Sequence, residues 1–401
     1  MLIGIDIRPL MHPVRTGVGE YIYELLDALF KIDKQNQYFL FYNSSGDVLK
    51  NLPKWEQENV HYAGFKYPNK LFNLALLIFK QPKLDRLILK KIKQYNNVTI
   101  KQSDNLDYWF SPNINFTAIS KKCRQILTIH DLSFEYFPDC FSLKRRLWHK
   151  ILNPKKAYQR ADMILTPSEN TKRDVIGEYK ISEDKIKVIY PGLSEKFRAN
   201  SSEPIENLKK KYNLPDKFIL FLGTLEPRKN IIGLIEAFNA SELRTIGYEL
   251  VIAGAKGWKF KPIMDLIAKS DKVRYIGYVD MADKQGLYVL AGIFAYPSLY
   301  EGFGFPVLEA MFAGAPVITS NRSSLPEVVR DCAYLVNPNN VDDIAQGLLK
   351  LSGNKELSDY FIQNGKRRAE QFKWEKTAEE FLQLLKINKS SVIKILDSVN
   401  S

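Results

Sequence analysis

The sequence predicts an α/β protein of two successive doubly wound domains. Short apolar runs typical of buried parallel strands alternate with helical patterns along most of the chain. The alternation restarts after a charged, weakly apolar stretch from Ser194 to Pro215, which we expect to connect two domains. At 401 residues the chain is also too long for one ordinary core, because a domain usually holds roughly 100–200 residues.

The first half opens with a strand, a glycine turn and a helix, the start of a doubly wound unit. An apolar run at Leu2–Ile7 precedes Gly17 and Gly19, and apolar residues then recur every three or four positions from Tyr21 to Phe30. Ser168 starts a typical helix-start signature. Further strands are expected at residues 38–42, 108–111, 125–128, 163–167 and 186–190.

The second half repeats this pattern and ends in a tail. The tail is amphipathic from Trp374 to Leu385, and a further short helix is expected at Ser390–Val399. We therefore predict Rossmann-like domains at residues 1–194 and 195–375 and a helical tail at 376–401, with ligand sites at the carboxyl edges of the strands, facing one another across a cleft. Strands are expected at residues 218–222, 249–253, 273–276, 293–296 and 316–319.

Composition excludes several classes of protein. Hydrophobic residues make up 45% and charged residues 26%, which is typical of a globular protein rather than a disordered or fibrous one. No apolar run approaches the ~18 residues that a membrane span requires, and the start of the chain lacks the pattern of a basic signal peptide. Cys123, Cys140 and Cys332 are too scattered for a disulfide framework or a cysteine metal site. We expect a cytoplasmic protein.

The net charge of +13 is concentrated in the first half, where residues 1–195 hold 30 basic and 21 acidic side chains. Nine basic residues lie between Lys66 and Lys101 against the single acid Asp85, interleaved with leucines and isoleucines, and a second basic cluster runs from Lys144 to Arg160. Two interpretations stay open: contact with an anionic membrane surface, or packed helices with a solvated basic face. No helix-turn-helix, zinc-finger spacing or RNA-binding aromatic motif occurs, so we expect no nucleic-acid partner.

Two loops with glycines or cations suit phosphate groups. Gly17 and Gly19 stand at a helix start, where backbone N–H groups favour anions, but Ile22 replaces the third glycine of a dinucleotide fingerprint and disfavours NAD. Arg228 and Lys229 follow the strand at 218–222 and suit a diphosphate, unless they are ordinary surface charges of a solvated loop.

The segment Glu301-Gly-Phe-Gly-Phe-Pro-Val-Leu-Glu309 is the strongest single feature. Its glycines allow backbone N–H groups to face a ligand, and Pro306 suits the first turn of a helix. Glu301 and Glu309 would then accept hydrogen bonds from hydroxyl groups on different parts of one polar ligand. The alternative is that they are two unrelated glutamates near a helix end.

His130 and Asp131 end the strand that begins at Gln125, a position suited to chemistry in the cleft, although a lone histidine is more often structural. The four histidines lack metal-ligand spacing and no Asp-x-Asp occurs, so we predict no metal site.

Taken together and in order, these segments resemble the retaining glycosyltransferases of family four, whose GT-B fold has two facing Rossmann-like domains. The resemblance implies a nucleotide-diphosphate sugar as substrate, with no cofactor and no metal. It spans nearly the whole chain, through residues 15–21, 128–131, 161–170, 223–230, 277–279 and 301–309.

The resemblance also implies roles for individual residues. Glu309 would bind the ribose and Glu301 the transferred sugar, with His130 near the reacting carbon. Lys229, together with Arg228, would neutralise the leaving diphosphate. In the family an arginine often stands where this chain has Thr224, and whether Arg228 compensates stays open. The remaining donor contacts would come from the amides of Gly302, Phe303, Gly304 and Phe305, from Gly17 and Gly19 as the first domain closes, and from Tyr278 and Val279 against the base.

The predicted activity is that of a metal-independent, retaining glycosyltransferase. The Phe303 and Phe305 form of the loop resembles bacterial mannosyltransferases of surface-polysaccharide assembly, so GDP-mannose is the first candidate donor. The acceptor would be a glycan or a polyprenyl-linked sugar bound to the first domain at the inner face of the cell membrane. The alternatives are a sugar-nucleotide epimerase of the same fold and a non-catalytic nucleotide- or sugar-binding protein at the membrane surface.

Overall fold

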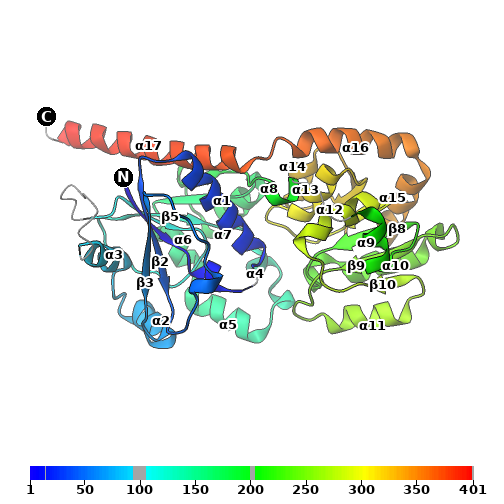
Figure 1. The fold of residues 1–401 in the computed structure, drawn as a ribbon, viewed down its shortest axis with the longest axis horizontal. Coiled ribbons are helices and arrows are strands. Elements are labelled where there is room, and N and C mark those ends of the chain that lie inside the picture. Colours follow the sequence, from blue (N-terminus) through cyan, green and yellow to red (C-terminus); the bar gives the residue numbers. More distant parts are fainter. Residues whose placement is uncertain (14, 94–104, 199–203, 400–401) are drawn as a thin grey trace.

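Two lobes, each built around one parallel sheet with helices on both faces, make up the computed structural model of the chain (Figure 1). The structure describes residues 1–13, 15–93, 105–198 and 204–399, and side chains as far as residue 386. Of the positions singled out above, Lys101, residues 199–203 of the expected connection and residues 400–401 of the tail lie outside the described residues.

The sheet of the first lobe has, within the described residues, seven parallel strands in the order β3-β2-β1-β4-β5-β6-β7. The chain therefore starts at the centre of the sheet and builds outward in both directions, as a doubly wound fold does. The strands are β1 (Leu2–Asp6), β2 (Gln37–Asn43), β3 (Val60–Phe65), β4 (Tyr108–Ser111), β5 (Arg124–Thr128), β6 (Met163–Thr166) and β7 (Ile186–Val188).

Helices cover both faces of this sheet, and the longest of those between its strands, α1, buries an apolar stripe that includes Ile22, Leu26 and Leu29. The helices are η1 (Arg8–Met11), α1 (Gly17–Ile32), η2 (Leu49–Asn51), α2 (Asn69–Ile78), α3 (Leu84–Ile92), α4 (Ser133–Tyr136), η3 (Pro138–Cys140), α5 (Leu143–Leu152), α6 (Pro154–Arg160), α7 (Glu169–Tyr179) and η4 (Glu183–Lys185).

The sheet of the second lobe has six parallel strands in the described part of the chain, in the order β10-β9-β8-β11-β12-β13. They are β8 (Phe218–Leu222), β9 (Glu249–Ala253), β10 (Val273–Tyr275), β11 (Ile293–Tyr296), β12 (Val317–Ser320) and β13 (Tyr334–Val336). The helices are α8 (Glu195–Arg198), α9 (Ile205–Lys211), η5 (Pro227–Lys229), α10 (Ile231–Ala240), η6 (Glu242–Arg244), α11 (Lys261–Lys269), α12 (Met281–Leu290), α13 (Phe305–Ala313), α14 (Leu325–Val329), α15 (Val341–Gly353) and α16 (Lys355–Ala369).

The predicted strands all form, and two further strands, β3 and β13, were not predicted. Both lie at an edge of their sheet. The side chains of β3 are mostly half-buried and β13 has only three residues, so neither shows the long apolar run of a buried central strand. The expected connection at Ser194–Pro215 lies between the two sheets, and within it the short helices α8 and α9 form and pack on α12.

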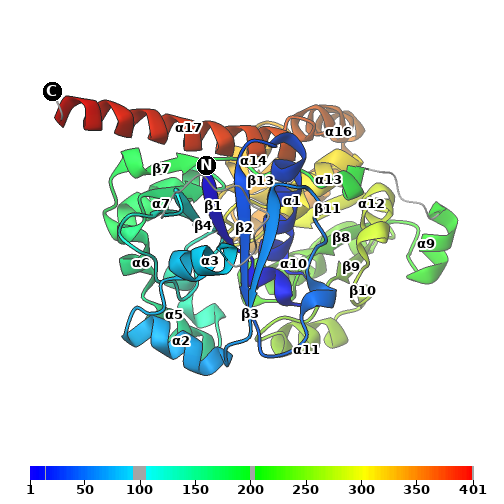
Figure 2. The same ribbon diagram turned by 60° about the vertical axis from the view of Figure 1, so that its left-hand side comes forward.

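The tail forms one continuous helix, α17 (Trp374–Val399), so the separate helix expected at Ser390–Val399 is wrong. The segment contains no glycine or proline that would interrupt a helix. Figures 1 and 2 show α17 lying along α1 of the first lobe, where Trp374, Phe381 and Leu385 are buried. The chain thus returns to the first lobe after completing the second.

The two crossings between the lobes lie side by side. The Leu193 N–H donates to the Phe372 carbonyl oxygen at 3.0 Å, and the Thr377 hydroxyl donates to the Tyr190 carbonyl oxygen at 2.7 Å. Because both crossings share these bonds, they form one paired connection. The limits predicted for the three domains remain a prediction; the first predicted limit falls between β7 and β8.

The basic stretch at Lys66–Lys101 divides into two helices with different surroundings. In α3, Ile88 and Ile92 are buried in the core, as the packed-helix interpretation expects. In α2, Leu74 and Ile78 are about half exposed, at 49% and 58%. Among the described residues, no helix has the length and apolar character that crossing a membrane requires.

Candidate active site

The loop after β8 places two cations and one carboxylate at the carboxyl edge of the second sheet. The short helix η5 contains Arg228 and Lys229, with Glu226 just before it. Glu226 and Lys229 are buried, and Arg228 donates to a Glu226 carboxylate oxygen at 2.8 Å. Arg228 also donates to the Tyr300 carbonyl oxygen at 2.5 Å. The positive groups are therefore fixed in position and are not ordinary solvated charges.

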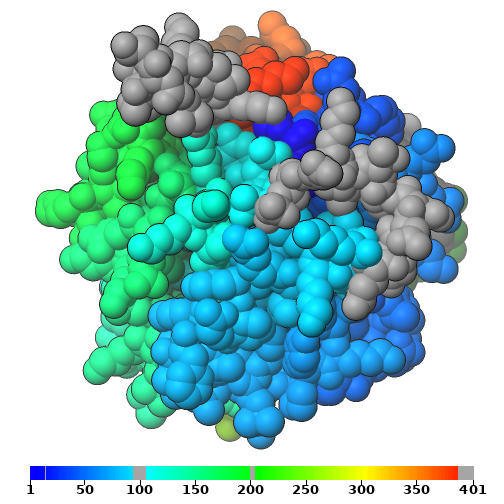
Figure 3. All heavy atoms as spheres, turned by 90° about the vertical axis from the view of Figure 1, so that its left-hand side faces the viewer, coloured from blue at the N-terminus to red at the C-terminus, as the bar shows by residue number. Residues whose placement is uncertain are grey.

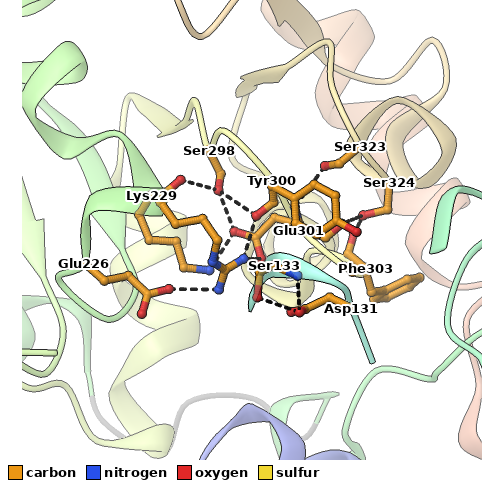
Figure 4. Close-up of polar contacts among 12 residues, drawn as sticks. Asp131, Ser133, Glu226, Lys229, Ser298, Tyr300, Glu301, Phe303, Ser323 and Ser324 are labelled. Atoms are coloured by element: carbon orange, nitrogen blue, oxygen red, sulfur yellow. Dashed lines mark hydrogen bonds and ion pairs between the residues drawn. The ribbon is translucent and has the colours of Figure 1, made fainter. Parts of the chain in front are cut away.

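The loop after β11 brings Glu301 to the same place. Its carboxylate accepts hydrogen bonds from Lys229 Nζ at 2.6 Å, from Ser298 Oγ at 2.7 Å and from Arg228 Nη1 at 3.1 Å. Figure 4 shows Lys229, Ser298 and Glu301 pointing toward one another, with Glu226 on the far side of the cations. Two predicted site segments separated by 72 residues thus meet in one buried cluster.

Charges balance within this cluster, and their pKa values reflect it. Burial raises the pKa of Glu301, but the charges of Lys229 and Arg228 outweigh burial and hold this pKa at about 2. Burial and the charge of Arg228 lower the pKa of Lys229, against the opposing effect of Glu301. Burial also lowers the pKa of Arg228, but the charges of Glu301, Glu226 and Asp131 outweigh burial, so this pKa is raised above its ordinary value. Glu301 is therefore a carboxylate, able to accept hydroxyl hydrogen bonds.

The turn from Glu301 into α13 leaves backbone N–H groups unused. Gly304 is the N-cap of α13 with a φ of +108°, a conformation that glycine adopts without the strain of a side chain. The N–H groups of Gly302, Phe303 and Gly304 have no acceptor among the described residues. A helix start with free N–H groups beside two cations is suited to an anion such as a phosphate.

Phe303 and Phe305 point away from the charged cluster. Phe303 is buried, with ring centroids 5.3 Å from Phe305 and 5.6 Å from Phe372, and Figure 4 shows its ring turned away from Glu301. Phe305 in turn stacks at 6.5 Å on Trp374. Their side chains therefore anchor the loop in the core, and only their backbone groups are available to a ligand.

The first lobe contributes His130 and Asp131 at the end of β5. His130 Nε2 lies 2.8 Å from the Pro112 carbonyl oxygen, which can only accept, so Nε2 carries the proton and a neutral ring has Nδ1 as its acceptor. Burial lowers the pKa of His130, which favours the neutral ring. Asp131 accepts hydrogen bonds from the N–H and the hydroxyl of Ser133, at 2.9 and 2.6 Å.

The two lobes touch directly at Gly302. A Cβ at this position would lie 1.9 Å from the His130 carbonyl oxygen, so only glycine fits between the lobes in this arrangement. The Gly302 carbonyl oxygen accepts hydrogen bonds from Ser168 Oγ at 2.7 Å and Thr171 Oγ1 at 3.2 Å. Ser168, predicted from its helix-start signature, thus caps α7 and also binds the other lobe.

A second carboxylate, Glu327 in α14, also joins the lobes. It accepts hydrogen bonds from the N–H groups of Glu169 and Asn170 in the first turn of α7, at 2.8 and 3.1 Å, and from the Tyr190 hydroxyl at 2.6 Å. Glu327 was missed from the sequence, as were Glu226, Ser298 and Tyr300. Glu226 shares a loop with Lys229 and could have been found, whereas nothing local indicates the partner of Glu327.

Glu309 lies in the first turns of α13 and is buried. It accepts a hydrogen bond from the Tyr288 hydroxyl at 2.9 Å, and Lys284 lies 3.7 Å away. Tyr278, just beyond β10, is 61% exposed, and its neighbour Val279 is buried. The carboxyl ends of parallel strands share one edge of the sheet, so Tyr278 and Glu301 stand on the same edge.

Gly17 and Gly19 form the first turn of α1. The Thr16 side chain caps this helix by accepting from the Gly19 N–H at 3.4 Å. A Cβ at Gly17 would meet no atom within 4 Å, and one at Gly19 would first meet Arg15. The helix start is therefore open to an approaching ligand, but among the described residues no hydrogen bond or ion pair links it to the Lys229 cluster.

Two family models match the chain and together span most of it. The model of Glycosyltransferase Family 4 matches residues 15–197, and the model of Glycosyl transferases group 1 matches residues 204–368. The chain is a glycosyltransferase. The family resemblance noted from the sequence is therefore confirmed.

Named relatives of this glycosyltransferase include two from Escherichia coli. O-antigen chain mannosyltransferase B is 29% identical over 96% of this chain and 100% of that protein. Serotype-specific mannosyltransferase WbdA is 33% identical over 62% of this chain, which corresponds to 32% of that longer protein.

Solved structures confirm the GT-B fold of the glycosyltransferase. Sucrose-phosphate synthase from Thermosynechococcus elongatus superimposes with a TM-score of 0.71 at 18% identity, covering 97% of this chain and 99% of that one. Alr3699/HepE from Anabaena, solved with UDP and glucose, gives a TM-score of 0.68 at 17% identity over 96% and 99%. At these identities the likeness concerns the fold alone.

Proposed function

We propose that this glycosyltransferase transfers mannose from GDP-mannose, with retention of anomeric configuration, to a glycan or polyprenyl-linked acceptor in surface-polysaccharide assembly at the inner face of the cell membrane. The choice of mannose rests on the relatives, which include a full-length match named as an O-antigen chain mannosyltransferase. The Lys229–Glu301 cluster beside the free N–H groups of the α13 loop is the observation that carries the reaction type.

The cluster supplies what the leaving group needs. When a glycosyl–phosphate bond breaks, negative charge grows on the departing diphosphate and positive charge on the anomeric carbon. Lys229 and Arg228 are already held in place by Glu301 and Glu226, so they would stabilise the diphosphate without rearrangement. With the N–H groups of Gly302, Phe303 and Gly304, they would supply this stabilisation without a metal ion.

Sugar hydroxyls would be recognised by carboxylates. Glu301, which stays ionised, would accept hydrogen bonds from hydroxyl groups of the mannose, and Glu309 would accept them from hydroxyl groups of the ribose. His130 Nδ1, on the opposite lobe, would accept from a hydroxyl near the reacting carbon. Retention would follow if the acceptor attacks from the side of the leaving phosphate, which then takes the acceptor proton. The nucleobase would lie against exposed Tyr278.

The reaction is tested with purified protein, GDP-mannose and a mannose-terminated acceptor. We expect GDP release only when the acceptor is present, and NMR of the product should show an α linkage. Release of GDP or a new GDP-sugar without acceptor would instead indicate hydrolysis or an epimerase and would contradict the proposal.

The site assignment is tested by substitution. Glu301→Gln and Lys229→Ala should each lower kcat/KM by about a hundredfold or more, because each removes a fixed charge at the reacting groups. Exposed Glu356 and Lys269 in the same lobe provide matched controls, and Glu356→Gln and Lys269→Ala should leave kcat/KM unchanged. Full activity of both site variants would exclude the assignment.

A further inference from the structure

The helix α5 of the first lobe turns an apolar stripe outward. Leu143, Leu147 and Ile151 follow one another at four-residue steps and are exposed by 80%, 58% and 45%. Such a stripe normally faces the core of a protein, but of the residues in α5 only Leu152 is buried. The outward stripe therefore lacks the packing partner that its pattern requires.

A second outward stripe lies on α2. Leu71, Leu74 and Ile78 are exposed, and Phe79, at the end of the helix, is 71% exposed. The opposite side of α2 buries Leu76 in the lobe. Figures 1 and 2 both show α2 beside α5 at the lower edge of the first lobe, and in Figure 3 the light-blue segment that contains α2 covers the lower centre of the end face.

Between the two stripes lies a cavity of about 260 Å³. Its walls come largely from α2, α5 and α6, and its lining includes three cations, Lys80, Lys156 and Arg160. The lining also includes the loop at residues 114–117, Ser111 of β4, Gln125 and Leu127 of β5, and Asn153 between α5 and α6. We call the two stripes and this cavity the α2–α5 face.

The cations of the cavity are not neutralised by the protein. The segment from Ser142 to Arg160 has seven basic residues and no acid. Lys156 and Arg160 have no carboxylate partner among the described residues. Burial and the charges of Arg160, Lys156 and Lys83 lower the pKa of Lys80, a sign that these cations repel one another. An anion in the cavity would relieve this repulsion.

We propose that the α2–α5 face docks on an anionic phospholipid bilayer, with both apolar stripes in the interface and the phosphate of one lipid headgroup in the cavity. Outward apolar residues flanked by lysines and arginines are the composition of helices that lie in a membrane surface. A free phosphate ion would satisfy the cations but leave the stripes in water, which is why we choose a lipid.

The docked orientation suits the proposed function, on which this inference builds. Phe141, just before α5, stacks on Trp258 of the second lobe with ring centroids 5.4 Å apart. The face thus extends to the junction of the lobes, and docking would hold the cleft next to the membrane, where a polyprenyl-linked acceptor resides.

Vesicle flotation tests the docking. The full chain is mixed with vesicles of phosphatidylcholine alone or with phosphatidylglycerol, and we expect flotation with the anionic vesicles. Leu143→Ser/Leu147→Ser/Ile151→Ser should weaken partitioning at least about tenfold, because it removes apolar contact. Lys156→Gln/Arg160→Gln should weaken partitioning by about thirtyfold on anionic vesicles, because the protein loses two cations that attract the lipid headgroups.

Matched controls lie on the second lobe. Ile246, 54% exposed, provides an apolar control as Ile246→Ser, and exposed Lys269 and Lys355 provide a charge control as Lys269→Gln/Lys355→Gln. The proposal is wrong if the wild-type chain remains in the unbound fraction, or if the control substitutions weaken flotation as much as the substitutions in the α2–α5 face. The proposal is also wrong if inorganic phosphate raises the Tm of the wild type but not of Lys156→Gln/Arg160→Gln, while both proteins float equally well with anionic vesicles. The cavity would then bind free phosphate and not a lipid headgroup.

Donor binding is measured separately by the shift in Tm with GDP-mannose, which we expect to be the same in wild type and in all face variants. Absence of this shift in the wild type would count against the proposed donor and leave the flotation result standing.

Discussion

The Lys229–Glu301 ion pair has two roles that the structure does not separate. Both side chains are buried, so removal of one partner leaves an uncompensated charge, which typically costs about 3–5 kcal/mol of stability. The same pair stands at the free N–H groups where a phosphate would bind. Substitutions at these residues therefore need a stability measurement beside the kinetic one.

The titration of Glu301 gives a prediction for acid stability. Its pKa in the folded chain is about 2, below the ordinary 4.5, so the ionised form stabilises the fold above pH 4.5 and this contribution is lost as the pH falls toward 2. The loss is on the order of 3 kcal/mol. Urea unfolding from pH 5 to 3 should show a shallower fall for Glu301→Gln than for wild type; parallel curves would contradict it.

The local sequence could predict these residues but not their pairing. Lys229 and Glu301 were each identified from a loop pattern and expected to face a ligand. That they also bind each other, with Glu226 holding Arg228, depends on how β8 and β11 align in the sheet. Glu327 had no such pattern, because its partners are backbone N–H groups of the other lobe.

The helix α17 shows how tertiary contacts decide what an element does. Its sequence predicted an amphipathic tail, and in the structure its apolar side packs on α1. The ring of Phe381 also lies 4.8 Å from the ring of Phe110 in β4. The part of the tail from Trp374 to Leu385 is therefore part of the core of the first lobe. The same pattern of apolar spacing in α5 is turned to solvent, so spacing alone could not tell which surface each helix would meet.

Phe381→Ala should destabilise the chain by about 3–5 kcal/mol, because it removes a fully buried ring from this core. Gln383→Ala, at an exposed position on the same helix, should change stability by less than about 0.5 kcal/mol. Thermal and urea unfolding measure both variants. An equal effect of the two would show that α17 is not packed as described.

The whole molecule is held in its present arrangement by polar contacts between the lobes. Ser168 and Thr171 bind the Gly302 carbonyl oxygen, the Tyr300 hydroxyl donates to Asp174 at 2.6 Å, and Glu327 caps α7 from across the junction. Water can replace the partner in each of these hydrogen bonds, so we expect the lobes to separate and close again without unfolding.

Glu327→Ala should shift the molecule toward an open arrangement by about tenfold, because a carboxylate at a helix start and its hydrogen bonds are lost. Small-angle X-ray scattering should show a larger radius of gyration, and kcat should fall while GDP-mannose still raises the Tm. Glu356→Ala, exposed on α16, should behave as wild type. An unchanged scattering curve for Glu327→Ala would exclude this role.

The adjacent crossings near Tyr190 and Phe372 make the junction a single pivot at one end of the cleft. Because two neighbouring chain segments are anchored there, we expect the second lobe to rotate about one main axis. A small rotation at this pivot would then produce a large displacement at the opposite end of the cleft. Phe141 and Trp258 stack on each other just before α5 and α11, which Figure 1 shows on the side opposite α16 and α17. Their two rings should therefore part early as the lobes open, and the fluorescence of Trp258 could report this movement.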